Sequence, residues 1–466
     1  MIVSPAWAGK RWAVLGLARS GAATVRALLA AGSGVTAWDE DEAKRREILP
    51  GTGRWQPQAD GGGSATGAPV ESPLHHPAAP DGPPPRRGED LVVALLDNLT
   101  GFDALLVSPG VPLNAHPIAD RARDAGVPII GDIELFAQAR ANLPPHKVVG
   151  ITGTNGKSTT TALIHHILVT AGTPSLMGGN IGLPILAQEP LPAGGVYVLE
   201  LSSYQIDLTR SLDCEIAVLL NITPDHLDRY DGFEAYATSK ARLFAMQFPS
   251  HDAVIGIGDA TSAQIARGLS ARGERLTKIA PGFCMDQSRW PALQGPHNAQ
   301  NALAAIAVAR ALGIGEADID RGLETFAGLP HRMERVGEVR GVTFVNDSKA
   351  TNPESVAPAL AAFDRIHWIV GGRAKSDDLS ACEPHFGHVA AAYTIGEAGS
   401  RFAEVLRGKV AVVEQAGTLD RAVRHAAAAA RPGDTVLLSP ACASFDQFSD
   451  FEARGDAFRT AVGGLR

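Results

Sequence analysis

Short apolar runs alternate with helix-forming segments along almost the whole chain, and this alternation restricts the possible folds more than any other feature. The first cycle has an apolar run at residues 12–15, a helical pattern at 22–30 and a second apolar run at 35–38. Strands that are joined through helices lie parallel, and helices cover both faces of their sheet. The sequence therefore predicts an α/β protein whose functional groups lie in loops at the carboxyl ends of strands.

Two interruptions of this pattern divide the 466 residues into three predicted domains. Residues 142–145, Asn-Leu-Pro-Pro, precede a new apolar strand, and residues 328–330, Gly-Leu-Pro, end a second series of strands and helices. Clusters of proline and glycine mark such breaks. We place the domains at residues 1–131, 132–328 and 329–466. Further expected strands are residues 104–107, 148–151, 196–199, 216–220, 253–257, 342–345, 366–370 and 435–438.

Residues 55–89 interrupt the first domain with a stretch that has no periodicity. They contain three consecutive glycines and three consecutive prolines, so we expect a flexible insertion that packs against little. His75 and His76 lie within it. We interpret them as a solvated pair, because no partners of ligand type are spaced nearby as a metal site would require.

The charge balance and the cysteines exclude several classes of protein. The chain has 42 Lys and Arg against 50 Asp and Glu, a net charge of -8, so nothing marks a nucleic-acid or anionic-membrane binder. No apolar run reaches the roughly 18 residues that a membrane helix needs. The N-terminal segment is a poor signal peptide, because Arg19 interrupts its apolar stretch. We therefore expect a cytoplasmic protein. The cysteines fit neither a zinc motif nor a disulfide framework, although long-range pairing stays open: Cys214, Cys284, Cys382 and Cys442.

A phosphate-binding loop is the strongest local motif. It follows an apolar strand, opens a helix expected at residues 159–171, and consists of Gly153, Thr154, Asn155, Gly156, Lys157 and Ser158. Backbone N–H groups in such a loop converge on phosphate, the lysine supplies a positive charge and the serine hydroxyl can bind Mg²⁺. The spacing departs from a full P-loop, because Ile151 stands where the first glycine would fall. The alternative is a glycine-rich turn with a solvated lysine, and we favour a triphosphate site.

Two further strand ends carry candidate metal ligands. Glu200 ends the apolar run at residues 196–199, where an acid could reach a metal beside the phosphates, although a lone Glu there is usually a cap. His226 follows the run at residues 216–220 among carboxylates. Alone it would be a loop histidine, but its position beside an expected Mg-nucleotide favours a function.

Lys240 lies within the apolar stripe of a helix predicted at residues 233–248. Tyr236 precedes it by four residues, and Leu243 and Phe244 follow by three and four. One interpretation is a snorkelling lysine with its ammonium at the rim. The other is a desolvated, reactive amine that combines with carbon dioxide to give a carbamate, an anionic ligand suited to Mg²⁺. The spacing alone does not decide between them.

The remaining candidate groups also follow predicted strands or open predicted helices. Asn298 and Asn301 lie on one face before a helix expected at residues 302–311, where N-capping is the alternative for Asn298. Three strand ends of the last domain, at residues 346–351, 371–375 and 439–445, carry lysines, hydroxyls and an arginine, and we expect them to form a crevice for a small carboxylate.

The first domain contains a weakened dinucleotide fingerprint. Its residues 16–21 have Ala18 in place of the second glycine, which crowds the approach of a pyrophosphate. Asp39 nevertheless stands at the end of the second strand, where a ribose or base ligand would be expected. This pattern indicates a second, nucleotide-like ligand.

Taken as an ordered set, these motifs resemble the Mur ligase family of ATP-dependent amide-forming enzymes. The resemblance rests on residues 153–158, 200–205, 225–230 and 297–301, and residues 178–182, 329–332, 346–351 and 439–448 narrow it to the D-glutamate-adding branch. It implies a Rossmann-like N-terminal domain that binds a UDP substrate, a central P-loop ATPase-type domain with a parallel or mixed sheet, and a Rossmann-like C-terminal domain that binds the incoming amino acid. Tyr204 stands where many members have Phe.

The resemblance also implies roles for individual residues. ATP would contact the residues of the phosphate loop together with Asn301, Arg332 and Asp347. Two Mg²⁺ ions would be held by Ser158, Glu200, His226 and Lys240, the last as its carbamate, with Lys157, His226 and Lys240 as catalytic residues. The UDP substrate would lie on Gly16, Leu17, Ala18, Arg19, Asp39 and Asn180. D-Glutamate would contact Lys349, Thr351, Lys375, Ser444 and Phe451.

The reaction implied is addition of D-glutamate to UDP-N-acetylmuramoyl-L-alanine through an acyl phosphate, a step of peptidoglycan precursor synthesis that serves cell-wall growth, cell shape and division. The expected partners are these two substrates, with ATP and Mg²⁺ as cofactors, no nucleic acid and no membrane, and we expect a monomer. The alternatives are another ligase of the family, including a folylpolyglutamate-type one, a P-loop phosphotransferase, or a nucleotide-gated interaction module.

Overall fold

The computed structural model describes residues 1–48, 54–55, 91–225, 227–280, 286–374 and 376–465. These residues form two compact units. Unit 1 contains residues 1–152, 174–218 and 223–253, and unit 2 contains residues 153–173, 219–222 and 254–466. Three six-stranded sheets are present in the described part of the chain, one in each predicted domain. Within that part, no helix combines the length and apolarity that a bilayer crossing requires.

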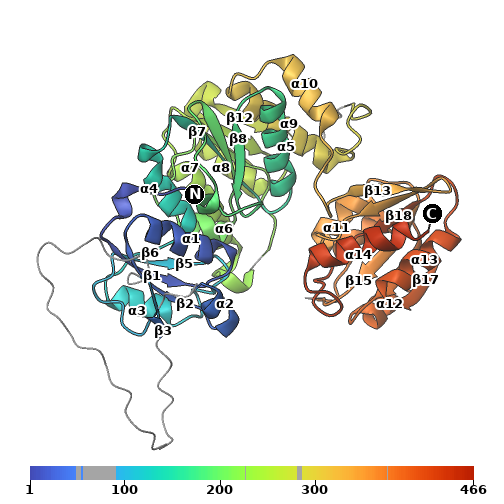
Figure 1. Ribbon diagram of the computed structural model, residues 1–466. Helices are drawn as coiled ribbons and strands as arrows, with labels where there is room; N and C mark the ends of the chain where they lie inside the picture. Colours follow the sequence, from blue (N-terminus) through green and yellow to red (C-terminus); the bar gives the residue numbers. More distant parts are fainter. Residues whose placement is uncertain (49–53, 56–90, 226, 281–285, 375, 466) are drawn as a thin grey trace, which may run out of the picture. The chain divides into compact units, whose positions relative to one another are not determined.

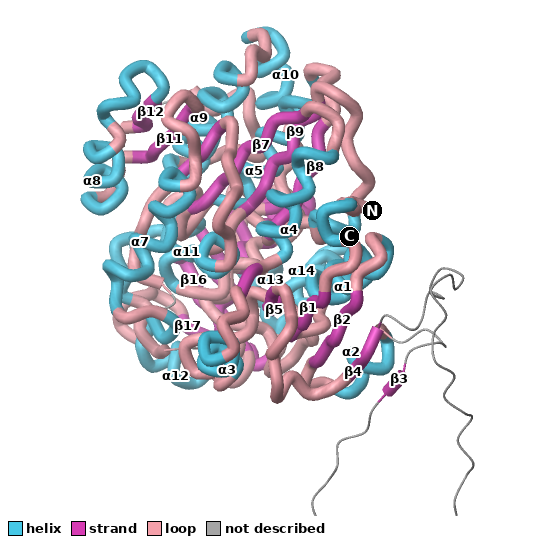
Figure 2. Tube along the Cα trace, turned by 90° about the vertical axis from the view of Figure 1, so that its left-hand side faces the viewer, coloured by secondary structure: helices cyan, strands magenta, loops and turns pink. Residues whose placement is uncertain are grey.

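The N-terminal sheet is built from parallel strands in the order β3-β4-β2-β1-β5-β6. Apart from the exposed Arg11 at the start of β1, the residues of β1 and β5 are apolar and buried on both faces, as a central parallel strand requires. Figure 2 shows β1, β2 and β5 side by side. The elements are β1 (Arg11–Leu15), α1 (Arg19–Ala30), β2 (Gly34–Trp38), α2 (Glu42–Glu47), β3 (Arg54–Trp55), β4 (Leu91–Val93), β5 (Ala104–Val107), α3 (Ile118–Asp124), β6 (Ile129–Ile130) and α4 (Asp132–Ala139).

The second sheet has the order β12-β11-β10-β7-β9-β8. Its predicted strands are present, whereas β8 and β12 were not predicted. The elements are β7 (His146–Thr152), α5 (Lys157–Thr170), β8 (Ser175–Gly179), β9 (Gly195–Glu200), α6 (Ser203–Asp207), β10 (Ile216–Leu219), α7 (Gly232–Ala245), β11 (Asp252–Gly256), α8 (Ala260–Gly268), β12 (Leu276–Ile279), α9 (Pro296–Ala311) and α10 (Glu316–Thr325).

The C-terminal sheet has the order β13-β14-β18-β15-β16-β17 and is mixed, because its edge strand β13 runs antiparallel to β14. One face packs on α11 and α12 through a core around Trp368, and the other packs on α13 and α14 around Phe458 (Figure 1). The elements are β13 (Glu334–Val339), β14 (Val342–Asn346), α11 (Pro353–Leu360), β15 (Ile366–Gly371), β16 (Val389–Ile395), α12 (Gly399–Leu406), β17 (Val413–Gly417), α13 (Leu419–Ala429), β18 (Thr435–Leu438) and α14 (Phe451–Gly463).

Several sequence-based expectations fall outside the described residues: the predicted insertion apart from Trp55, with His75 and His76, and also Cys284, His226 and Lys375. The three cysteines that the structure describes are buried free thiols.

Candidate active site

The phosphate loop joins β7 to α5. Gly156 occupies the N-cap of α5 with φ at 85°, in the left-handed region that favours glycine. A Cβ at this position would lie only 2.3 Å from Oδ1 of Asn301. Glycine is therefore needed for both the backbone conformation and the approach of Asn301. The loop leads into a 14-residue helix, whose N-terminal N–H groups favour an anion.

The ammonium of Lys157 lies over this loop. Its Nζ donates hydrogen bonds to the carbonyl oxygens of Gly153 at 2.8 Å and Thr154 at 2.7 Å. Asn221, just after β10, supports the loop: its Oδ1 accepts from the N–H of Asn155 at 2.8 Å, and its Nδ2 donates to the Asn155 carbonyl at 3.1 Å. Sequence reasoning placed Asn221 at a strand end but assigned it no role.

A pocket within unit 2 unites most of the predicted nucleotide ligands. It encloses about 1040 Å³, including space open to solvent, and has an apolar wall that contains Leu220, Ile279 and Met333. A nucleoside needs such a wall for its base and a few polar groups for orientation. The predicted ATP ligands that line it are Asn155, Gly156, Asn301, Arg332 and Asp347, and Lys349, predicted for the amino acid, lines it too.

Asp347 follows β14 and is buried in this pocket. Its Oδ2 accepts a hydrogen bond from Oγ of Ser439 at 2.7 Å, and its Oδ1 accepts from the N–H of Met333 at 3.2 Å. Burial raises the pKa of the Asp347 carboxyl to about 7, against the lowering effect of these hydrogen bonds. Asp347 thus ties the end of β18 to the segment that carries Arg332.

Arg332 and Ser158 contact each other directly. Nη2 of Arg332 donates to Oγ of Ser158 at 2.8 Å, and Ser158 is buried in the first turn of α5. Two residues predicted to bind the nucleotide, separated by 174 positions, are therefore neighbours.

The start of α9 differs from the expectation. The helix begins at Pro296 with Gly295 as its N-cap, so the N-capping interpretation of Asn298 is wrong. Oδ1 of Asn298 instead accepts from Nδ2 of Asn301 at 3.1 Å, and this contact orients the amide of Asn301. Burial lowers the pKa of the neighbouring His297 to about 4, so its imidazole is neutral near pH 7.

The predicted UDP-substrate residues come together in unit 1. Oδ2 of Asp39 accepts from the N–H of Leu17 at 2.6 Å, which joins the fingerprint loop to the end of β2. The Gly16 carbonyl accepts from Oγ of Ser108 at 2.8 Å. Arg19 donates from Nη2 to the carbonyl of Gly182 at 2.7 Å. The fingerprint loop is therefore held by groups from two other strand ends.

Glu200 is a buried carboxylate at the end of β9. Its Oε1 accepts from Nδ2 of Asn180 at 2.9 Å, whereas its Oε2 is buried without a hydrogen-bond partner in the structure. The capping interpretation is wrong, because Ser202 caps α6 through a capping box with Gln205. A buried anionic oxygen without a donor fits a Mg²⁺ ligand. Within the described residues, which exclude His226, no group of three His, Cys, Asp or Glu forms a metal cluster.

Lys240 is buried in α7, as the apolar stripe predicted. Only 2% of its surface is exposed, which argues against a snorkelling ammonium at the rim. Its Nζ lies 4.6 Å from the ring centroid of Tyr236, and Leu243 and Phe244 are buried one turn later.

Arg229 is a residue that sequence reasoning quoted in a motif without assigning a role. Its guanidinium lies 4.4 Å from the ring centroid of Tyr204, which stacks on Tyr230. Its Nη2 donates to the carbonyl of Val111 at 2.8 Å, in the loop that follows β5. Arg229 therefore joins the loop after β5 to the segment just beyond residue 226.

The predicted amino-acid residues that the structure describes lie in unit 2, around the ends of β14 and β18 and the start of α14. Nζ of Lys349 lies 4.6 Å from the ring centroid of Phe451, the first residue of α14. Arg373 and Ala443 exchange backbone hydrogen bonds at 2.9 and 3.1 Å, which tie the end of β15 to that of β18, and Ser444 beside them is buried. The described part of the crevice thus joins three strand ends.

Comparisons with known proteins decide the family. The model of the Mur ligase middle domain matches residues 151–282, and that of the Mur ligase, glutamate ligase domain matches residues 331–442. The UDP-N-acetylmuramoylalanine--D-glutamate ligase of Novosphingobium aromaticivorans is 59% identical, covering 100% of this chain and 97% of that protein. Its namesake in Sphingopyxis alaskensis is 58% identical, covering 100% of both. The chain belongs to the Mur ligase family.

Solved Mur ligases share the fold. UDP-N-acetylmuramate-alanine ligase from Thermotoga maritima aligns over 98% of this chain and 100% of that one, with a TM-score of 0.58 and 15% identity. MurF ligase from Thermotoga maritima in complex with ADP aligns over 75% and 92%, with a TM-score of 0.55 and 16% identity. The matched family models and the two relatives confirm the Mur ligase resemblance and the assignment as an ATP-dependent ligase. The solved structures confirm the α/β fold of three domains.

Proposed function

We propose that this Mur ligase joins D-glutamate to UDP-N-acetylmuramoyl-L-alanine at the expense of ATP, in peptidoglycan precursor synthesis. The observation that carries the choice of substrates is the full-length identity of 58–59% to two relatives of that name. The choice of nucleotide is supported by the pocket that unites the phosphate loop with Asn301, Arg332 and Asp347. We further propose that the enzyme acts in the cytoplasm as a monomer and that its product serves cell-wall growth and division.

In the proposed nucleotide site, the loop of residues 153–156 and the start of α5 bind phosphate oxygens, and Lys157 turns from the loop carbonyls toward them. Asn301 and Asp347 orient the nucleoside, while Arg332 binds the phosphates. A neutral His297 beside Asn298 adds no charge to this site. The three kinds of group match what a Mg-nucleotide needs: N–H donors, cations and a few oriented amides.

Ser158, Glu200, His226 and Lys240 would hold Mg²⁺ at two positions, with Lys240 as its carbamate. When bound, the metal neutralises phosphate charge that would otherwise repel a carboxylate. Two observations support this set: the buried Oε2 of Glu200 lacks a hydrogen-bond partner in the structure, and Lys240 is buried inside the protein, as a metal ligand would be.

The proposed chemistry uses charge rather than covalent catalysis by the protein. The alanyl carboxylate attacks the γ-phosphorus and releases ADP, and the amine of D-glutamate then displaces phosphate from the acyl phosphate. Lys157 and Arg332 counter the negative charge of the first step. Asn180, with Asp39 and residues 16–19, positions the UDP substrate, while Lys349, Thr351, Lys375, Ser444 and Phe451 position D-glutamate so that its amine faces the acyl carbon.

A product assay tests the proposal. The purified chain is incubated with ATP, Mg²⁺ and UDP-N-acetylmuramoyl-L-alanine, together with D-glutamate, L-glutamate, L-lysine or diaminopimelate. The UDP-linked products are identified by mass spectrometry. We expect a product only with D-glutamate, together with phosphate release that needs both substrates. A product with another amino acid, or with a folate and L-glutamate, would assign a different ligase. Phosphate release without either substrate would indicate a phosphotransferase or ATPase, and nucleotide binding without product would indicate an interaction module.

A further inference from the structure

Arg454 is a buried cation beneath the proposed amino-acid crevice to which the function above assigns no role. It is the fourth residue of α14 and is 1% exposed. Among the described residues it forms no ion pair. The carboxylate of Asp446 interacts with the guanidinium only from beyond ion-pair distance, and burial of a charge without a close partner is costly, so this arginine calls for a specific use.

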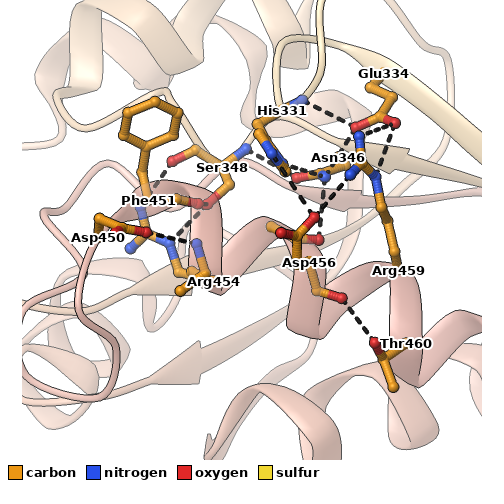
Figure 3. A network of polar contacts seen from close by, with 12 residues as sticks. His331, Glu334, Asn346, Ser348, Asp450, Phe451, Arg454, Asp456, Arg459 and Thr460 are labelled. Atoms are coloured by element: carbon orange, nitrogen blue, oxygen red, sulfur yellow. Dashed lines mark hydrogen bonds and ion pairs between the residues drawn. The ribbon is translucent and has the colours of Figure 1, made fainter.

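The guanidinium holds the peptide group between Ser348 and Lys349. Its Nη2 donates to the Ser348 carbonyl at 2.7 Å, and its Nε donates to Oγ of Ser348 at 2.9 Å (Figure 3). The N–H of Lys349, at the other end of that peptide, donates to the carbonyl of His331 at 3.0 Å. One peptide group is thus fixed from both ends, between Asp347 on the nucleotide side and Lys349 on the amino-acid side.

The third nitrogen of the guanidinium reaches the other two strand ends. Nη1 of Arg454 is buried without a hydrogen-bond partner in the structure. A Cβ built on Gly372, just after β15, would lie 3.2 Å from this Nη1, 3.0 Å from Cβ of Cys442 and 2.4 Å from the Ala443 carbonyl. The positive charge therefore lies where the ends of β14, β15 and β18 meet.

Gly455, which follows Arg454 in α14, leaves space for the side chain of His331, in the segment that carries Arg332. A Cβ on Gly455 would lie 2.0 Å from Nδ1 of His331. The same His331 has φ at 61° and donates its N–H to Glu334, as Figure 3 shows. Asn346 contacts this ring and the Gly455 carbonyl through Nδ2, at 3.0 and 3.2 Å. The Arg-Gly pair thus contacts both the loop after β14 and the segment before β13.

We propose that Arg454 is a positioning residue for both subsites: it fixes the Ser348–Lys349 peptide, and with it Asp347 and Lys349, while its charge favours an anionic amino acid in the crevice above. The inference rests on the proposed function for the identity of that amino acid. It predicts that the KM for the amino acid and the affinity for nucleotide weaken together when Arg454 is replaced.

The test compares Arg454→Met, which keeps most of the stem but removes charge and hydrogen bonds, with Arg454→Lys, which keeps the charge. Arg424→Met is the matched control, because Arg424 lies on α13 in an exposed ion pair with Asp420. We expect Arg454→Met to raise the KM for D-glutamate about tenfold or more and to weaken binding of a non-hydrolysable ATP analogue about threefold. Arg454→Lys should recover a large part of both, and Arg424→Met should match the wild type.

A purely structural role would lower the fraction of folded enzyme, and so kcat, without changing KM. Arg454→Met that folds and keeps both constants within twofold of wild type would overturn the proposal. If that variant does not fold, the same criterion applies to Arg454→Lys, for which we expect at least a threefold rise in the KM for D-glutamate. If the wild type ligates another amino acid, the proposed function fails. The role of Arg454 is then still tested by the KM for that amino acid and by the affinity for the ATP analogue.

Discussion

Arg332 donates a hydrogen bond to Ser158 at 2.8 Å, so the segment that precedes β13 contacts the first turn of α5 directly. Both residues are expected to turn to ligands, the serine to Mg²⁺ and the arginine to phosphate. Under the proposed function, nucleotide binding would replace this contact. In the structure the contact brings the two side chains together at the first turn of α5.

Replacement of Arg332 tests this arrangement. We expect Arg332→Met to reduce kcat/KM for ATP by about 100-fold, since a charge-assisted hydrogen bond to phosphate contributes about 2–3 kcal/mol. Steady-state kinetics measure the effect, with Arg335→Met as a control because Arg335 pairs with Glu338 at the surface. Equal losses in the two variants would show that Arg332 has no specific role at the nucleotide.

Two glycines with nearly the same φ, one in the phosphate loop and one after the end of α5, separate the effect of backbone strain from that of close contact. Gly156 and Gly172 have φ of 85° and 76°, but only a Cβ on Gly156 meets a neighbour, Oδ1 of Asn301 at 2.3 Å. Gly172→Ala should therefore cost about 1 kcal/mol of unfolding free energy and leave nucleotide affinity unchanged. Gly156→Ala should also weaken ATP binding by at least tenfold, measured by calorimetry. Unchanged affinity in Gly156→Ala would contradict the need for close approach.

Lys240 provides the sharpest test of the metal site. We expect Lys240→Ala to abolish ligation, because it removes the carbamate ligand, while Lys409→Ala, at an exposed ion pair with Glu383, leaves it intact. Short carboxylic acids should restore part of the activity by filling the space with a carboxylate. Independently of folding, NMR of the wild type under ¹³C-labelled carbon dioxide should show a carbamate signal that the variant lacks. Full turnover by Lys240→Ala would refute the carbamate.

The pH dependence of stability tests the burial of Asp347. Its pKa is raised from 3.8 to about 7, so the folded protein binds a proton that the unfolded chain releases above about pH 4. The unfolding free energy contributed by this group therefore falls as pH rises from 4 to 7 and is constant above 7. Denaturant unfolding of wild type and Asp347→Asn across this range should show the decline in the difference between the two. A difference that does not vary with pH would place the pKa of Asp347 near its ordinary value.

The central strands could be predicted from the sequence because both of their faces are buried. For this reason β5 is a continuous apolar run, and β15 and β18 are nearly so, with His367 and Thr435 as their polar residues. Most strands that were not predicted are edge strands: β3, β8, β12, β13 and β17. Two internal strands were also not predicted, β4, which has only three residues, and β16, which contains three consecutive alanines. An edge strand such as β13 carries Glu and Arg on its exposed positions, so it has no apolar run to detect.

Residues of the candidate site could likewise be predicted only where their neighbours in sequence carry the signal. Lys240 could be placed in the apolar stripe of its helix because its neighbours in sequence, Tyr236 and Leu243, share one helical face with it, although this pattern did not decide between burial and a snorkelling ammonium. Arg454 could not be predicted, since its partner Ser348 is 106 residues away and a buried arginine has the same local pattern as an exposed one. The cap at Asn298 was wrong because Pro296 starts the helix two residues earlier, with Gly295 in the capping position.

The bond between Arg229 and the Val111 carbonyl has a consequence for inhibitor design. A compound that displaces the loop after β5 would break this hydrogen bond and remove one of the contacts that hold the guanidinium on Tyr204. Under the proposed function, such a compound would act on the enzyme without imitating ATP.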